Sequence, residues 1–253
     1  MYYCCGITEK GVMPHNEDAL LIGRRIFDMG ADEQTITGAF TAAVSDGVSG
    51  ENSGEVASKM CLEKLKDADV SEPGIIGENI LAIHRQIRDH SRESEEDRNM
   101  QTTLCGVRID DSGSVTAFNV GDSRLYSYQC GRLRQISRDQ SLVQMLIERG
   151  SITASQSKTH IRRNIIFPVI GSNSADPKVD VSVMSQPMEC GDMLLLCTDG
   201  LSDHVPAMDI QEILELPKPL PERLSILVKT ALERHSNDNI SIIAILCQEK
   251  DIG

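Results

Sequence analysis

The order of the strand-like and helix-like runs is the feature that most limits how this chain can fold. Two long helical stretches, at about 52–68 and 73–96, separate the third strand-like run from the fourth. The strand-like runs lie at 2–8, 19–27, 39–46, 102–109, 114–120, 124–129, 132–137, 178–184, 193–198 and 239–247. Strands that cluster in this way, without a helix between each pair, predict antiparallel sheets with segregated helices.

Hydrophobic periodicity supports both kinds of element. Val179, Val181 and Val183 alternate with polar residues, as expected of a half-buried strand. Isoleucines at 76, 80, 83 and 87 follow helical spacing. Further helices are expected near 139–149, 206–215 and 220–235. No linker divides the 253 residues, so we expect one domain over 1–253, with the weakly patterned segment 150–177 as a surface flap.

Charge and composition exclude several classes of protein. The formal net charge is −13, which disfavours a nucleic-acid binder and an anionic membrane surface as partners. No apolar run is long enough to span a bilayer, and the start M-Y-Y-C-C-G-I-T-E-K does not resemble a signal peptide. The eight cysteines form no C-x-x-C pair and lie mostly in apolar runs. We therefore expect a cytoplasmic protein.

Acidic residues mark the ends or beginnings of several strand-like runs. They are Glu17, Asp18, Asp46, Asp122, Asp199 and Asp238. A single Asp-Gly step is commonly just a turn or a cap. Several carboxylates at one edge of a sheet, however, would repel one another unless divalent cations held them. Oxygen ligands favour a hard ion, so Mg²⁺ or Mn²⁺ is expected.

Two adjacent metal ions suggest phosphoryl-transfer chemistry. Such a pair bridges a water, lowers its pKa and stabilises an in-line displacement at phosphorus. The chain offers no convincing protein nucleophile: it has no G-x-S-x-G motif, and no cysteine is followed six positions later by arginine. A cysteine-based phosphatase is therefore excluded.

Six motifs, in order, resemble those of the metal-dependent Ser/Thr protein phosphatases, the protein phosphatase 2C-like or PPM family. They are N-E-D (16–18), V-S-D-G-V-S-G (44–50), T-T-L (102–104), V-G-D-S-R-L-Y (120–126), C-T-D-G-L-S-D (197–203) and D-N-I-S (238–241). The compact length and the run S-G-E-V-A-S (53–58) are most similar to the bacterial branch. The resemblance implies an α+β fold, a four-layer α-β-β-α sandwich with two central antiparallel sheets.

The resemblance also implies a role for each acidic residue. Asp46 would bridge two tightly bound Mn²⁺ or Mg²⁺ ions, with Asp199 and Asp238 on one of them. Glu17 or Asp18 and the carbonyl of Gly47 would serve the other ion. Asp122 would join Asp199 at a third, weaker ion. A metal-bridging hydroxide would then attack phosphoserine or phosphothreonine in proteins that are targets of a Ser/Thr kinase.

The chain departs from the family pattern where substrate is handled. Met13 replaces the phosphate-binding arginine, and Val48 stands where some relatives place a histidine general acid. His15, Arg162 and Arg163 are the candidate substrate-binding residues. Arg24 and Arg25 are further basic residues near the first motif.

Two other functions fit part of the sequence. A catalytically weak or inactive pseudophosphatase, acting as a metal-binding regulatory module, would explain Met13. A serine esterase is suggested by G-D-S-R (121–124), but that class needs a D-x-x-H motif, which the chain lacks. His84 and His90, on a charged helix, are expected to be solvated.

Overall fold

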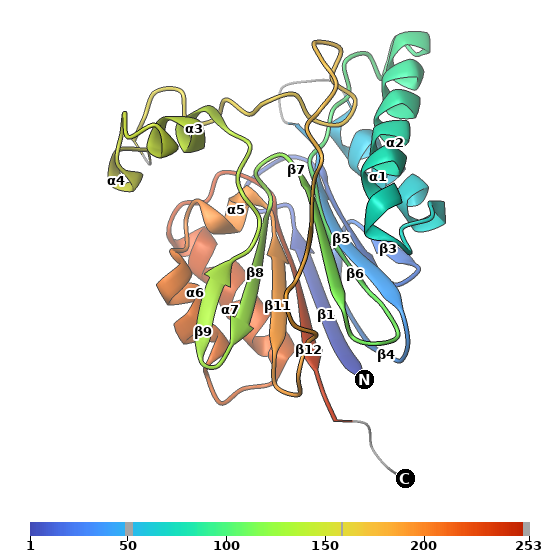
Figure 1. Cartoon of the computed structure of the whole chain (residues 1–253). Helices are drawn as coiled ribbons and strands as arrows, with labels where there is room; N and C mark the ends of the chain where they lie inside the picture. The colour runs from blue at the N-terminus through green and yellow to red at the C-terminus, as the bar shows by residue number, and fades with distance from the viewer. Residues whose placement is uncertain (49–52, 158, 250–253) are drawn as a thin grey trace.

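Two six-stranded sheets form the centre of the protein, as the computed structural model shows for residues 1–48, 53–157 and 159–249 (Figure 1). The first sheet has the order β4 (Gly30–Ile36), β1 (Tyr2–Glu9), β12 (Ile240–Cys247), β11 (Met193–Cys197), β8 (Arg124–Gln129) and β9 (Arg132–Gln135). The second has the order β10 (Asp180–Val183), β7 (Val115–Val120), β6 (Leu104–Ile109), β5 (Phe40–Asp46), β2 (Asp18–Ile22) and β3 (Arg25–Phe27). Every pair of neighbouring strands is antiparallel.

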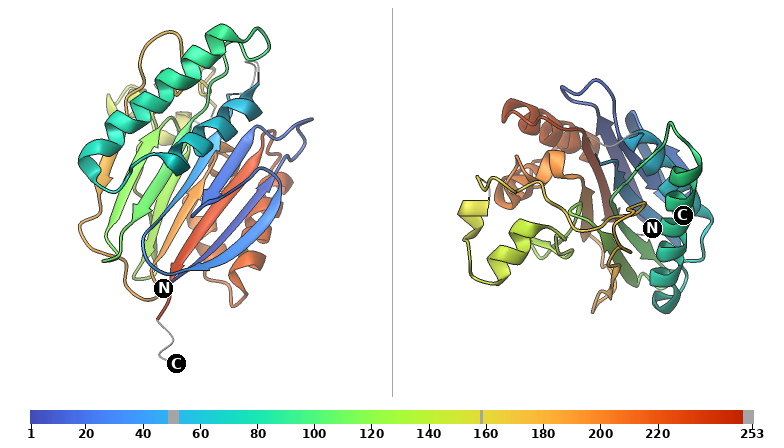
Figure 2. Two further views of the ribbon diagram at one scale, coloured as in Figure 1. Left: turned by 90° about the vertical axis from the view of Figure 1, so that its right-hand side faces the viewer. Right: turned by 90° about the horizontal axis from the view of Figure 1, so that it is seen from above.

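Helices cover the outer faces of both sheets. Figure 2 shows α1 and α2 over the second sheet, and α6 and α7 lie over the first. The helices are α1 (Gly54–Asp67), α2 (Pro73–Glu93), α3 (Leu142–Glu148), α4 (Ala154–Ser157), α5 (Asp199–Ser202), α6 (Ala207–Leu214) and α7 (Leu220–Glu233). The fold is therefore the expected α+β, four-layer α-β-β-α sandwich. No helix in the described ranges has the length and apolarity to cross a bilayer.

Burial on both faces explains the uninterrupted apolar runs. In β2, Leu20 and Ile22 pack between the sheets, whereas Leu21 packs under α1 and α2. In β11, Leu196 faces the inter-sheet core and Leu195 faces the outer layer of α6 and α7. Sheets covered on both faces need apolar side chains at successive positions. Such strands can carry an aspartate only at their ends, where the apolar layers stop.

Three predictions about elements or residues were wrong. The run 19–27 is a hairpin, because Gly23, with φ of +60°, turns the chain between β2 and β3. Strand β4 was not predicted, since its sequence G-A-D-E-Q-T-I forms an exposed edge with little apolar pattern. His84 is fully buried rather than solvated, and its Nδ1 accepts a hydrogen bond from the Gly171 N–H at 3.1 Å.

Candidate active site

Strand pairing places two of the predicted acidic residues side by side. Asp18 begins β2, Asp46 ends β5, and the two are direct partners in the register of these strands. The Asp46 carbonyl accepts hydrogen bonds from the Thr103 N–H and the Thr102 hydroxyl, both at 2.8 Å. The N–H of Asp46 in turn donates to Thr103 Oγ1 at 3.2 Å. The backbone of Asp46 is therefore held on both sides.

A buried threonine connects Asp18 to the other sheet. Thr198, which directly precedes Asp199, donates from Oγ1 to Asp18 Oδ2 at 2.9 Å. The same hydroxyl accepts the Ser241 N–H of β12 at 3.1 Å. Asp18 and Asp199 therefore lie across the gap between the two sheets. Nothing in the sequence around Thr198, within the motif C-T-D-G-L-S-D, indicates this role.

Asn239 fixes the chain before β2 against the start of β12. Its Oδ1 accepts the Glu17 N–H at 2.8 Å, while its Nδ2 donates to the carbonyls of Lys10 and His15 at 3.0 and 2.9 Å. Asn239 directly follows Asp238, and its N–H donates to Asp238 Oδ1 at 2.8 Å. Asn239 thus holds Glu17 through its side-chain amide and Asp238 through its backbone N–H. Spacing alone did not reveal this role.

Two glycines allow β5 and α1 to meet beside Glu17. A Cβ on Gly47 would lie 2.3 Å from the Gly54 carbonyl oxygen, and a Cβ on Gly54 would lie 3.0 Å from the Glu17 carboxyl carbon. The N–H of Gly47 donates to the Glu17 carbonyl at 3.1 Å. Glu17 and Gly47, both predicted to serve one ion, are therefore neighbours.

Electrostatics show that the acidic residues act on one another. Burial raises the pKa of Asp46 well above its usual value, and the charges of Asp18, Asp199, Asp238 and Asp122 raise that pKa further. Burial and neighbouring carboxylates also raise the pKa of Asp199. Burial is the main cause that raises the pKa values of both Asp18 and Asp122 to about 7. Together these five aspartates form the acidic cluster.

The acidic cluster has the donor chemistry that a hard divalent cation needs. Asp18 Oδ1 and Asp199 Oδ1 are buried and have no hydrogen-bond partner in the part of the chain that the structure describes. An orphaned buried carboxylate oxygen is costly unless a cation compensates it. As it stands, no group of three or more His, Cys, Asp or Glu side chains in the described ranges is arranged to hold an ion. The donor atoms are therefore of the kind that binds a hard divalent cation, and the assignment of individual ligands stays a prediction.

A pocket of ≈ 260 Å³ opens from the acidic cluster toward the segment 150–177. Asp122 and Asp199 line it on one side, and Arg163 lines it from the flap segment. Arg124, also in the lining, forms a bidentate pair with Asp139, with contacts of 2.6 and 3.0 Å. A phosphate group in this pocket would meet both the carboxylates and Arg163.

The other candidate substrate residues lie differently. Arg162 and His15 are exposed, and neither lines this pocket. Arg24 and Arg25 lie beyond the far end of β2, where they pair with Asp67 and Asp32 at 3.7 and 3.1 Å. They are therefore not placed to replace the arginine that is absent at Met13.

The position of Ser123 also argues against the serine esterase alternative. Ser123, the serine of G-D-S-R, is fully buried, and its hydroxyl is hydrogen-bonded to Thr103 Oγ1 at 2.8 Å. A serine in this position offers no exposed nucleophile to a substrate.

Comparisons with known proteins agree with this arrangement. The family profile described as protein phosphatase 2C matches residues 28–237. The serine/threonine phosphatase stp of Listeria monocytogenes is 33% identical over 256 residues, which cover 97% of this chain and 94% of that protein.

Two solved structures are also similar. The serine/threonine phosphatase of S. agalactiae superimposes with a TM-score of 0.83 at 25% identity, over 98% of this chain and 100% of the other. The catalytic domain of the phosphatase PstP, in complex with two manganese ions, gives a TM-score of 0.77 at 25% identity, with 98% and 100% covered.

Proposed function

This chain belongs to the protein phosphatase 2C family, and on that premise we propose how its residues carry out the reaction. It is a serine/threonine protein phosphatase that depends on metal ions. The observation that carries the proposal is the acidic cluster, in which two buried carboxylate oxygens lack any hydrogen-bond partner. The proposed substrates are phosphoproteins that a Ser/Thr kinase has modified.

We assign two Mn²⁺ or Mg²⁺ ions, and a third weaker one, to the acidic cluster. Asp46 would contact two of them, Asp199 and Asp238 one, and Glu17 or Asp18 with the Gly47 carbonyl the other. Asp122 and Asp199 would hold the third. When bound, such ions lower the pKa of a shared water, so that a nucleophile is available at neutral pH. The relative that holds two manganese ions supports the count of two.

The protein's own contribution is to position these groups. Thr102 and Thr103 fix the Asp46 backbone by hydrogen bonds, and this fixes the direction in which the Asp46 side chain projects from the end of β5. Thr198 holds Asp18, and Asn239 holds Asp238 and the chain at Glu17. Preorganised groups need no reordering as charge develops at phosphorus.

Arg163 is the proposed contact for the substrate phosphate. It lines the pocket beside Asp122 and Asp199, whereas Met13 cannot donate a hydrogen bond. We assign segment 150–177 as a flap beside the site, within one catalytic domain over 1–253. A cytoplasmic location completes the proposal, and it is supported by cysteines that are all free, six of them buried.

The decisive experiment is phosphate release from a phosphothreonine peptide, with and without Mn²⁺. Asp46→Asn removes the central carboxylate, and we expect it to lower the rate at least ~10²-fold. Asp111→Asn is the matched control, because Asp111 is exposed and its side chain caps only the Ala39 N–H. Release that equals the Asp46→Asn background in every metal would instead identify a pseudophosphatase. The named phosphatases among its relatives disfavour that alternative.

A further inference from the structure

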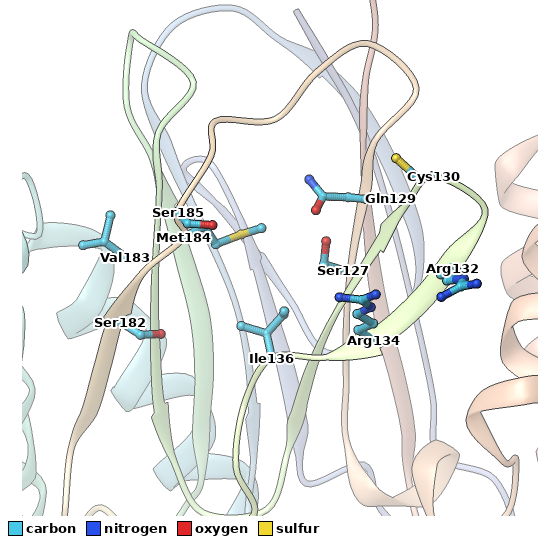
Figure 3. A pocket seen from close by; sticks show the side chains of 10 residues that line it. All are labelled: Ser127, Gln129, Cys130, Arg132, Arg134, Ile136, Ser182, Val183, Met184 and Ser185. Atoms are coloured by element: carbon cyan, nitrogen blue, oxygen red, sulfur yellow. The ribbon is translucent and has the colours of Figure 1, made fainter.

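A second pocket, of ≈ 640 Å³, lies between the two sheets where both end in short edge strands. Figure 3 shows its wall: Ser127 and Gln129 come from β8, Arg132 and Arg134 from β9, and Ser182 and Met184 from the segment around the end of β10. It shares no lining residue with the pocket at Asp122 and Asp199. On and just after β9 the two linings alternate, since Arg134 and Ile136 line this pocket whereas Gln135, between them, lines the other.

Polar side chains occupy this end of the inter-sheet space, where apolar ones would close it. On β8, Leu125 points into the inter-sheet core, and Ser127 is the next residue on that face. Ser127 is only 4% exposed, and no described residue offers its Oγ a hydrogen bond. Leaving a buried hydroxyl without a partner is destabilising. Since Ser127 lines the pocket, a ligand there would satisfy it.

Two arginines give this pocket its charge. Arg132 and Arg134 are the only charged residues among the described lining. They alternate with Leu133, which packs toward the helices of the outer layer, so both lie on the opposite face of β9. Within the ranges that the structure describes, neither has a carboxylate within ion-pair distance. Both side chains are exposed, so the pocket presents two positive charges that no neighbouring carboxylate among the described residues neutralises.

We propose that this pocket binds a small organic dianion, either a phosphomonoester or a dicarboxylate. Arginine forks match the planar or tetrahedral oxygens of such groups, and hydroxyls such as Ser127 add neutral hydrogen bonds. Ile136 and Met184 provide an apolar surface for an aliphatic or sugar part. Among the described residues no aromatic ring lines the pocket, so stacking of a nucleobase is not expected. The volume is in the range of small-molecule sites.

The test is isothermal titration calorimetry on the full chain in EDTA. Without metal ions the acidic cluster repels anions, so binding elsewhere is measured independently of phosphatase activity. Glucose 6-phosphate probes the phosphomonoester class, succinate probes the dicarboxylate class, and glucose is the neutral control. We expect one of the two anions to bind with 1:1 stoichiometry and glucose not to bind.

Substitutions locate that binding. The double variant Arg132→Ala/Arg134→Ala should weaken it at least ~10-fold, because it removes both sources of charge-assisted hydrogen bonds to the anion. Arg85→Ala is the matched control, since Arg85 is an exposed arginine on α2, on the outer layer of the other sheet. Ser127→Ala should weaken binding several-fold without lowering the melting temperature of the free protein.

Three results would overturn the proposal. One is the absence of binding by both anions, and another is binding that survives the double arginine substitution. The third is binding of a phosphopeptide that needs Arg132 and Arg134 while neither small anion binds. That last result would identify a docking site for a protein instead. These binding measurements do not depend on phosphatase activity, so they can be interpreted even if the phosphatase assay shows no activity.

Discussion

At the scale of single residues, the site depends on small polar groups that hold the carboxylates. Thr198 donates a hydrogen bond of 2.9 Å to Asp18, 180 residues away, and Asn239 accepts one of 2.8 Å from Glu17, 222 residues away. Sequence analysis found the aspartates because each interrupts an apolar run. It did not find these two residues, because threonine and asparagine are ordinary at the ends of strands.

Asp18→Asn tests whether the buried carboxylate destabilises the metal-free protein. Burial raises the pKa of Asp18 to about 7, whereas in the unfolded chain it lies near ~3.9. The folded state therefore binds the proton more tightly, and this group's contribution to the free energy of unfolding falls as pH rises from ~4 to ~7. In EDTA at pH 8, Asp18→Asn should unfold at a higher urea concentration than the native chain. We expect its free energy of unfolding to be about 1–3 kcal/mol larger.

The same comparison at pH 4 should show only a small difference, because Asp18 is then protonated in the folded protein and already about half protonated in the unfolded chain. Asp111→Asn should have little effect at either pH. A lower stability of Asp18→Asn at pH 8 would mean that the ionised carboxylate is compensated within the folded protein.

Arg163→Ala tests the proposed phosphate contact. Because Arg163 lines the pocket at Asp122 and Asp199, its loss should raise KM for a phosphothreonine peptide roughly 10-fold, with a smaller effect on kcat. Arg162→Ala is the neighbouring control, since Arg162 is exposed and outside that lining. Equal effects of the two substitutions would assign only a general electrostatic role to the flap.

At the scale of elements, the close approach of β5 and α1 constrains the site. The Cα of Gly47 faces the Gly54 backbone, where a methyl group would lie 2.3 Å from the carbonyl oxygen. This contact brings the Gly47 carbonyl and the Glu17 carboxyl to the same corner. The glycine of an Asp-Gly step is thus needed here for close packing, since Gly47 is not among the residues with positive φ.

Gly47→Ala should therefore separate β5 from α1. We expect a loss of about 1–3 kcal/mol in thermal or urea unfolding, together with weaker Mn²⁺ binding by calorimetry. Gly74→Ala is the control, because Gly74 lies in the first turn of α2 with nothing within 4 Å of a Cβ. That variant should be neutral or slightly more stable. Equal stability of the two variants would show that α1 can shift to accommodate the added methyl group without a loss in the free energy of unfolding.

At the scale of the whole molecule, the two sheets meet at the acidic cluster, where carboxylates from both sheets repel one another. Metal ions should therefore stabilise the entire fold. At a free Mn²⁺ concentration of ~100 Kd, binding adds about 2.7 kcal/mol, which corresponds to a melting-temperature increase of roughly 5–10 °C for a chain of this size.

The increase should be larger at pH 8 than at pH 5. Asp18 and Asp122 have pKa values of about 7 in the metal-free protein, so at pH 5 the ion must displace their protons. Differential scanning fluorimetry with Mn²⁺ at both pH values measures this. Asp46→Asn should reduce the increase at pH 8. A shift that is independent of pH would place the metal away from these carboxylates.

The amino-acid sequence by itself determined the class of fold and the acidic candidates. Apolar runs set the strands, stripes such as Ile76 to Ile87 set the helices, and aspartates could stand only where those runs stop. Local patterns of this kind depend on neighbours a few positions away, so they can be predicted from the chain.

Only the tertiary structure decided which residues meet. The burial of His84, the hydrogen bonds of Thr198 and Asn239, and the placement of Arg163 rather than Arg24 beside Asp122 all depend on contacts between distant segments. The pocket at Ser127 likewise exists because β8, β9 and the segment around the end of β10, which are far apart in the sequence, meet there. Such contacts follow from how the layers pack, and no periodicity in the sequence records them.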